Sequence, residues 1–287
     1  MINSVHKKRS SKGGVSPVIS TVVITGAMIA IVSVALVFAN NFLWSQVAEG
    51  EFNSSKQLMH TAGLQIDDVA WTVGRTETIR YASQYGDAVL EPSVLNYVVT
   101  VETNEGTNEF SNETAILMFK VPTSKYSVAN DYWERVFPSE DESLTLQGTS
   151  APVARVFVVE KLPMYDGSYI RVVVAPAIRV LFSSINASTS TYYVKMYLPV
   201  LEAGEAPRLS QSITLTGTSV EARTLSNVTS IDVSVSFPRA ASPENFDSAF
   251  FNFPFDSEEI PVPSSGYDNV VFELYLSEVS VEFGITW

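Results

Sequence analysis

The chain has 287 residues, with 18 Lys and Arg against 31 Asp and Glu and a formal net charge of −13. It contains no cysteine and only two histidines, which excludes disulfides, zinc–thiolate sites and multi-histidine metal centres. The acidic balance argues against nucleic acid as a partner, because phosphate neutralisation needs clustered Lys and Arg. On these grounds we expect no cofactor, no metal ion and no nucleic-acid partner.

The N-terminus combines a basic tail with a long uncharged segment. Residues 1–14 carry four basic side chains and no acidic one, and residues 15–48 carry no charged side chain. About 20 apolar residues are enough for a helix to cross a bilayer, so this segment is long enough to span one. The basic tail predicts a cytoplasmic N-terminus and a C-terminal region outside the membrane.

Three interpretations of this segment compete. A cleaved secretory signal fits poorly, because its apolar region runs about 7–15 residues and ends in an A-x-A-like site, and neither is seen here. A plain signal anchor fits well. The third interpretation depends on Gly13 and Gly14, which lie between the basic tail and the apolar segment. Cleavage there would remove the tail and leave the hydrophobic helix on the mature chain.

The run KGGVSPVIST, followed by an uncharged helix, resembles the N-terminus of archaeal type IV pilins. The resemblance extends from Lys12 to about Trp44. In that family a prepilin peptidase cleaves after a glycine, which implies cleavage between Gly14 and Val15, with Gly13/Gly14 as the alternative. Bacterial pilins carry a glutamate at the fifth residue of the mature chain, and here Ile19 stands at that place.

The resemblance implies a structural subunit, a major or minor pilin, of an archaeal surface filament, with adhesion as its generic role and no enzymatic activity. The helix would lie in the membrane first. An assembly ATPase and a platform protein would then draw it into the filament, where it packs against other subunits. The alternative is a single-pass surface protein whose β domain binds a ligand and never polymerises. An exported hydrolase is a third class, which would need carboxylates that converge in space.

The pattern divides the chain into three regions. Together with the resemblance, it implies a leader at residues 1–14, a transmembrane and filament-core helix at residues 15–66 and an extracellular β domain at residues 67–287. Residues 45–66 continue the helix, because apolar residues recur there at helical spacing. Gly50 and Asn53 weaken that pattern, which predicts a bend or break near 50–54.

Beyond residue 67, short runs of β-branched and aromatic residues alternate with turn residues. The fold class expected is α+β, a long hydrophobic helix followed by a mainly antiparallel β-sandwich. The predicted strands are 68–73, 77–83, 95–102, 115–121, 153–160, 169–175, 177–182, 192–198, 211–216, 231–237 and 269–283. One short helix is predicted at 127–136. The Pro- and Phe-rich region 238–266 is predicted to be an ordered loop, held to the sheet by its own aromatic side chains.

Four N-x-[ST] sequons lie beyond the apolar helix, on the side predicted to be outside. The candidate glycosylation sites are therefore Asn53, Asn112, Asn186 and Asn227.

Other candidate residues carry weaker signals. The acidic clusters 67–68, 140–142 and 256–259 lack the spacing of a calcium loop and are interpreted as solvated loops. His60 is interpreted as a packing or surface residue. Arg75 and Arg80, with nearby tyrosines, form either an exposed binding strip or an ordinary strand.

Overall fold

The computed structural model describes residues 17–139, 143–161, 167–186, 190–204, 211–241, 245–253, 256–263 and 265–284. The processing candidates Gly13, Gly14 and Val15 lie outside the described residues. The chain divides into two compact units, residues 1–47 and residues 48–287. One helix, α1 (Pro17–Ala70), contributes to both units.

Helix α1 is longer than predicted and uninterrupted. Pro17 suits its first turn, where backbone N–H groups have no partner within the helix. The predicted break near 50–54 is wrong, because burial of Ala48 and Phe52 outweighs the helix cost of Gly50, about 1 kcal/mol. The predicted strand at 68–73 is also wrong. Val69 and Ala70 continue the buried helical face before a turn follows.

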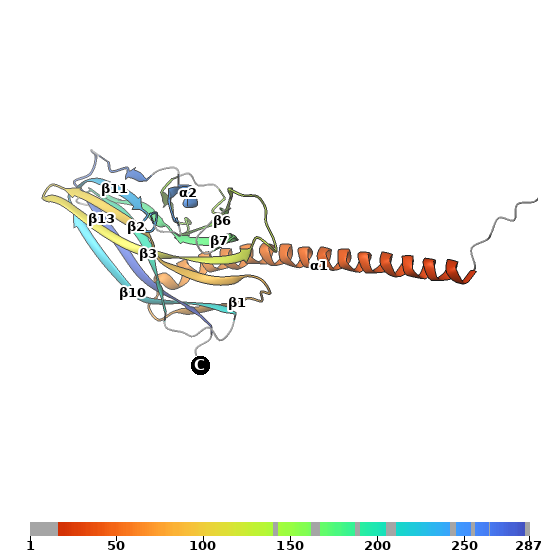
Figure 1. The fold of residues 1–287 in the computed structure, drawn as a ribbon. Coiled ribbons are helices and arrows are strands. Elements are labelled where there is room, and N and C mark those ends of the chain that lie inside the picture. The colour runs from red at the N-terminus through yellow and green to blue at the C-terminus, as the bar shows by residue number, and fades with distance from the viewer. Residues whose placement is uncertain are drawn as a thin grey trace, which may run out of the picture. The chain divides into compact units, whose positions relative to one another are not determined.

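The described strands form two sheets (Figure 1). The six-stranded sheet has the order β1-β10-β13-β9-β8-β5, and the seven-stranded sheet has the order β12-β11-β2-β3-β7-β6-β4. The bounds are β1 Thr76–Arg80, β2 Asp87–Thr103, β3 Gly106–Pro122, β4 Tyr132–Phe137, β5 Thr145–Gln147, β6 Ala154–Glu160, β7 Tyr169–Pro176, β8 Ile178–Asn186, β9 Ser190–Ala203, β10 Ser212–Ser226, β11 Val228–Ser236, β12 Ser257–Ile260 and β13 Asn269–Phe283, with a short helix α2 at Ser248–Phe251.

The strand pairing is mainly antiparallel, which confirms the predicted α+β class. Among the described pairs, β9–β13 and β5–β8 are parallel. The predicted helix at 127–136 is wrong, because β4 lies there and pairs antiparallel with β6. Its sequence YWERVF is rich in aromatic and β-branched residues, and the neighbouring strand satisfies its backbone groups.

Two apolar clusters form the core of the second unit. One contains α2 and residues from both sheets, and the other surrounds the C-terminal part of α1. Strand β6 is buried along its whole length, because Val156 and Val158 face the helix cluster while Phe157 and Val159 face the α2 cluster. A strand covered on both faces has a continuous apolar run in place of alternation.

The region 238–266 is not one long loop, because it contains α2 and β12. Its described aromatics pack on the chain's own sheet, as predicted. Asp247 caps α2 by accepting a hydrogen bond from the Phe250 N–H. Phe250 and Phe251 are buried edge-to-face against Phe157 of β6. This aromatic packing accounts for the order of a segment in which prolines limit regular strands.

The C-terminal end of α1 makes close contact with β10 at Gly217. A Cβ atom at Gly217 would lie 2.2 Å from the carbonyl oxygen of Val69. The same glycine exchanges backbone hydrogen bonds with the turn after the helix, accepting from Gly74 N at 2.8 Å and donating to Arg75 O at 3.0 Å. Position 217 therefore requires a residue without a side chain.

We expect Gly217→Ala to destabilise the second unit by about 1–3 kcal/mol, the usual cost of overpacking. The matched control is Gly50→Ala, where an added Cβ meets no atom within 4 Å. Removing this helical glycine should stabilise the chain by about 0.5–1 kcal/mol. Urea unfolding of the full chain in detergent, followed by circular dichroism, measures both changes. Equal effects of the two substitutions would contradict the close contact.

Candidate functional site

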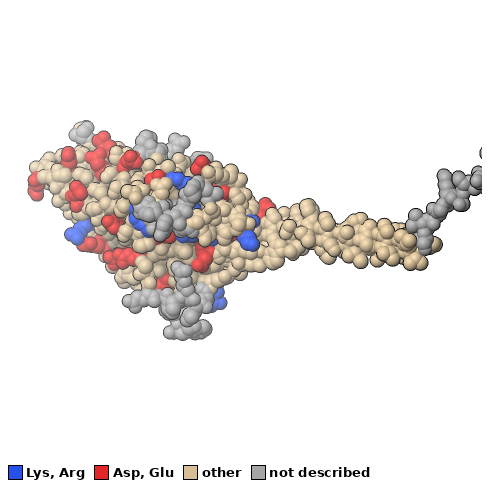
Figure 2. Space-filling view, in the orientation of Figure 1, with Lys and Arg blue, Asp and Glu red and all other residues tan. Residues whose placement is uncertain are grey.

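The first unit is an apolar helix exposed on all sides. From Pro17 to Val47 every residue except the half-exposed Ser20 is exposed, and none is charged. Phe38 is 74 % exposed and Trp44 is 45 % exposed. In Figure 2 this helix shows tan atoms, without the red and blue found on the β domain. Such a surface needs cover from lipid or protein, because exposed apolar area in water drives association.

By length and composition, α1 qualifies as a helix that can cross a membrane. No residue of its most apolar stretch is buried within the chain. This confirms the coarse expectation of an N-terminal apolar helix that can anchor in a membrane.

In the second unit α1 is one-sided. Its buried face packs against strands of both sheets, and Gly63 allows β6 to approach, since a Cβ there would lie 3.1 Å from the Cγ2 atom of Val156. The buried apolar residues of this face are Ala48, Phe52, Leu58, Met59, Ala62, Ile66, Val69 and Ala70. The opposite side presents polar residues such as Gln57 and Thr61 to solvent. This amphipathic pattern fixes the helix to the β domain by burial.

Glu51 ties the helix to the loop between β1 and β2. Its carboxylate accepts hydrogen bonds from the Ser83 hydroxyl and from the backbone N–H groups of Gln84, Tyr85 and Gly86. Partial burial of the Glu51 carboxyl raises its pKa, but these four donors together outweigh burial and lower the pKa below the ordinary value of 4.5. The ionised carboxylate is the form that holds the loop.

We expect Glu51→Gln to weaken this attachment by about 1 kcal/mol, because a neutral amide oxygen accepts less strongly than a carboxylate. The folded pKa is depressed, so the wild-type contribution is complete above pH 4.5 and is lost as pH falls through the lower folded value. Unfolding of both chains across this range should show their stability difference shrinking in acid. A difference that is the same at neutral and acidic pH would contradict the assignment.

A second polar contact links α1 to β4. Lys56 Nζ lies 2.6 Å from Glu134 Oε2, which also accepts a hydrogen bond from the Tyr132 hydroxyl at 2.8 Å. Burial, with the neighbouring Glu134, raises the pKa of Tyr132 to about 12. Partial burial raises the pKa of Glu134, but the hydrogen bonds from Lys56 and Tyr132 and the Lys56 charge outweigh burial and lower it, so the ionised carboxylate holds the edge strand near the helix.

The interpretation of the two described acidic clusters as solvated loops is half right: Asp68, Asp256 and Glu259 are exposed, but residues 67–68 lie on α1 and residues 258–259 on β12. Asp67 lies on α1 and accepts hydrogen bonds from Trp71 Nε1 at 2.8 Å and Arg179 Nη1 at 2.9 Å. Glu258 lies on β12 and accepts from the Thr145 N–H at 2.7 Å. Partly buried carboxylates usually accept hydrogen bonds from neighbouring donors. The cluster at 140–142 lies outside the described residues.

Two other candidates from the sequence have packing roles. His60 lies against Phe137, with ring centroids 4.7 Å apart, as expected of a packing residue. Arg75 lies near Asp68 and Glu77, at 3.4 and 3.3 Å, and Arg80 ends the edge strand β1. These contacts favour an ordinary strand over a binding strip.

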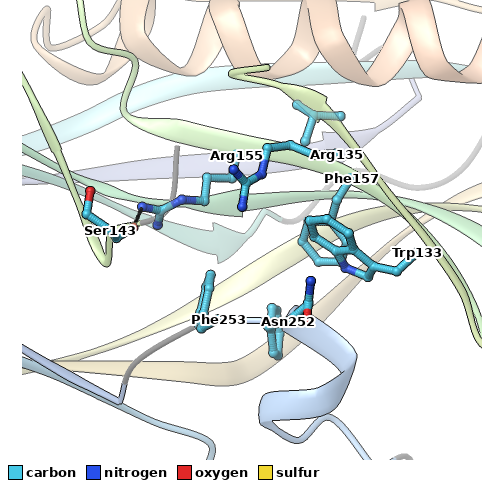
Figure 3. Close-up of a pocket in the computed structure, with 9 residues that line it drawn as sticks. Trp133, Arg135, Ser143, Arg155, Phe157, Asn252 and Phe253 are labelled. Atoms are coloured by element: carbon cyan, nitrogen blue, oxygen red, sulfur yellow. Dashed lines mark hydrogen bonds between the residues drawn. The ribbon is translucent and has the colours of Figure 1, made fainter. Parts of the chain in front are cut away.

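An open groove and a small cavity are found in the second unit. The groove, about 420 Å³, runs between the exposed side of α1 near Ser54 and the chain from Ile79 to Ala82. The small cavity, about 10 Å³, is lined by Trp133, Phe157 and Phe253 among others (Figure 3). In Figure 3 the Arg155 side chain points toward Ser143, whose carbonyl accepts its hydrogen bond at 2.7 Å. The cavity has room for about one water molecule.

An acidic face lies on the outer side of strands β12, β11, β2 and β3. Their register places Glu259, Asp232, Thr100 and Glu109 in one row across the four strands. Figure 2 shows several red groups on this part of the β domain. Among the described residues no group of three or more His, Asp or Glu side chains is arranged to hold a metal ion. The face is therefore a dispersed negative surface.

The sequon asparagines differ in how accessible they are to a glycosyltransferase. Asn227 is exposed in the turn between β10 and β11, with a positive φ of 58°. Asn53 lies within α1, and the hydroxyl of its sequon belongs to buried Ser55, which donates to Phe52 O. Asn112 lies within β3 with its amide nitrogen buried. The side chain of Asn186, at the end of β8, lies outside the described residues.

In a host that glycosylates exported proteins, we expect Asn227→Gln to remove a mobility shift on a denaturing gel. Asn53→Gln and Asn112→Gln are the matched controls and should leave that shift unchanged. The physical reason is access, because a transferase reaches an exposed turn more readily than a helix interior or a buried strand amide. A shift that depends on Asn112 and not on Asn227 would contradict the ranking.

No family model, no curated protein and no solved structure matches the chain.

Sequence reasoning missed the residues that connect α1 to the β domain. Glu51, Gly63 and Gly217 act through partners that lie far along the chain. The only local signal was the return of charge after the uncharged segment, first at Glu49 and then at Glu51.

Proposed function

We propose that the chain is a pilin-like subunit of a surface filament, with α1 as its membrane segment before assembly and its polymerisation element afterwards. The observation that carries the proposal is the uncharged, exposed part of α1 from Pro17 to Val47, in the sequence context KGGVSPVIST. The second unit is the part presented outside the membrane. Adhesion is the generic role of such a subunit.

The apolar surface of α1 can be covered first by lipid and then by protein. In a bilayer its backbone groups bond within the helix and its side chains contact lipid. In a filament the same apolar side chains are covered by the helices of other copies. The partners implied are a prepilin peptidase, an assembly ATPase, a platform protein and further copies of this chain. No catalytic role is proposed.

N-terminal sequencing of protein sheared from the cell surface tests the proposal. We expect a chain that starts at Val15, or at Gly14 under the alternative cleavage, in a high-molecular-weight fraction. Removal of the basic tail leaves an uncharged N-terminal helix that can leave the membrane only into a protein bundle.

Two variants sharpen this test. If cleavage follows Gly14, replacing it with Phe should block processing, and Gly13→Ala should have little effect. An intact leader on a chain that stays in the membrane pellet would overturn the proposal. That result would favour a membrane-anchored surface protein that does not polymerise.

A further inference from the structure

The apolar segment contains two adjacent asparagines. Asn40 and Asn41 are the only amide side chains between Pro17 and Trp44. A hydroxyl can bond back to its own helix, as Thr21 Oγ1 does to Pro17 O at 2.9 Å. A carboxamide offers two donors and an acceptor. Both asparagines are exposed, and neither makes a side-chain hydrogen bond within the described part of the chain.

The asparagines share one side of the helix with three of its small residues, Gly26, Ala30 and Ser33, whereas Ala27, Ala35 and Ala39 lie outside that side. At about 100° per residue, Gly26, Ala30, Ser33, Asn40 and Asn41 lie within a face about 100° wide. Ile24, Ile31, Phe38 and Phe42 lie on the other side of the helix. Small residues allow the backbone of a second helix to approach closely, which brings short polar side chains within hydrogen-bonding reach.

The position of Asn40 and Asn41 along the helix decides their surroundings in a bilayer. Residues 18–37 number about 20 and cover roughly the 30 Å of the hydrocarbon layer. In a bilayer this alignment leaves the asparagines near the level of Trp44, where interfacial side chains meet water and headgroups. The amides therefore cost little in the membrane. In a protein bundle they would be buried among apolar side chains, where an amide without a partner costs about 1–3 kcal/mol.

We propose that Asn40 and Asn41 fix the register and the facing side of the apolar helix against a second copy of the chain. The inference rests on the proposed function, since it requires helices of several copies to meet. We assign the partner helix to a second copy of the chain, because a carboxamide both donates and accepts hydrogen bonds and can therefore pair with the same group on an identical helix. Ser33, seven residues before Asn40, offers a further partner to a neighbour shifted along the axis.

No other side chains between Pro17 and Trp44 would select one axial alignment of two such helices as strongly. Between Pro17 and Val47 no side chain is charged, so no ion pair can select one alignment over another. Apolar side chains tolerate many alignments, whereas one buried asparagine specifies register in coiled coils at a cost in stability. By the same reasoning, Asn40 and Asn41 would select one alignment of the two helices more than they would strengthen the association.

Cysteine cross-linking of the chain in the high-molecular-weight fraction sheared from the cell surface, where the apolar helices would be bundled, tests the proposal, and the absence of native cysteine makes each introduced thiol unique. Single cysteines replace Gly26, Ala30 or Val37 on the asparagine face, and Ile24, Ile31 or Phe38 on the other side. After oxidation, disulfide dimers should form preferentially on the asparagine face. In an Asn40→Leu/Asn41→Leu background we expect this preference to fall roughly threefold or more, the effect of losing an interhelical hydrogen bond.

The matched control is Thr25→Leu, which also replaces a polar side chain with leucine but lies off the asparagine face. It should preserve the preference. An unchanged preference in the Asn40→Leu/Asn41→Leu background, with strong dimer formation, would overturn the inference and leave self-association standing. No dimer at any position in any background would overturn the inference together with the proposed polymerisation.

Discussion

The dominant constraint on this molecule is the uncharged surface of α1 from Pro17 to Val47. Burial of apolar area contributes about 25 cal/mol per Å², and none of the most apolar stretch is covered within the chain. The cover must therefore come from lipid or from other protein. An ordinary soluble core helix would show a buried face here. The exposure of apolar residues around the whole circumference distinguishes this segment from such a helix.

The same helix changes character at Ala48. From there to Ala70 it has one buried face, and both sheets contribute to its covering. Three kinds of contact fix it: close approach at Gly63 and Gly217, the four donors around Glu51, and the pairing of Asp67 with Arg179. These contacts are distributed along the helix, between Glu51 and Val69.

Much of the fold could be predicted from the sequence, because periodicity reports directly on local burial. The final strand, predicted at 269–283, matches β13, and β6 and β7 were recognised from their apolar runs. The errors arose where a distant partner decides the outcome. Residues 132–137 pair with β6, and residues 67–70 extend a face already buried by the sheets. Neither partner is visible in a window of ten residues.

Some features of the candidate site are also visible in the sequence, and others required the structure. The apolar segment is evident from composition, since its property is the absence of charge over many consecutive residues. The Glu51 contacts required the structure, because backbone N–H donors carry no side-chain signature. The asparagines lie between these cases. Their polarity is plain in the sequence, but their meaning depends on a continuous exposed helix that places them on the same side as Gly26, Ala30 and Ser33. A polar group on an otherwise uniform apolar surface is where alignment between identical helices can be decided.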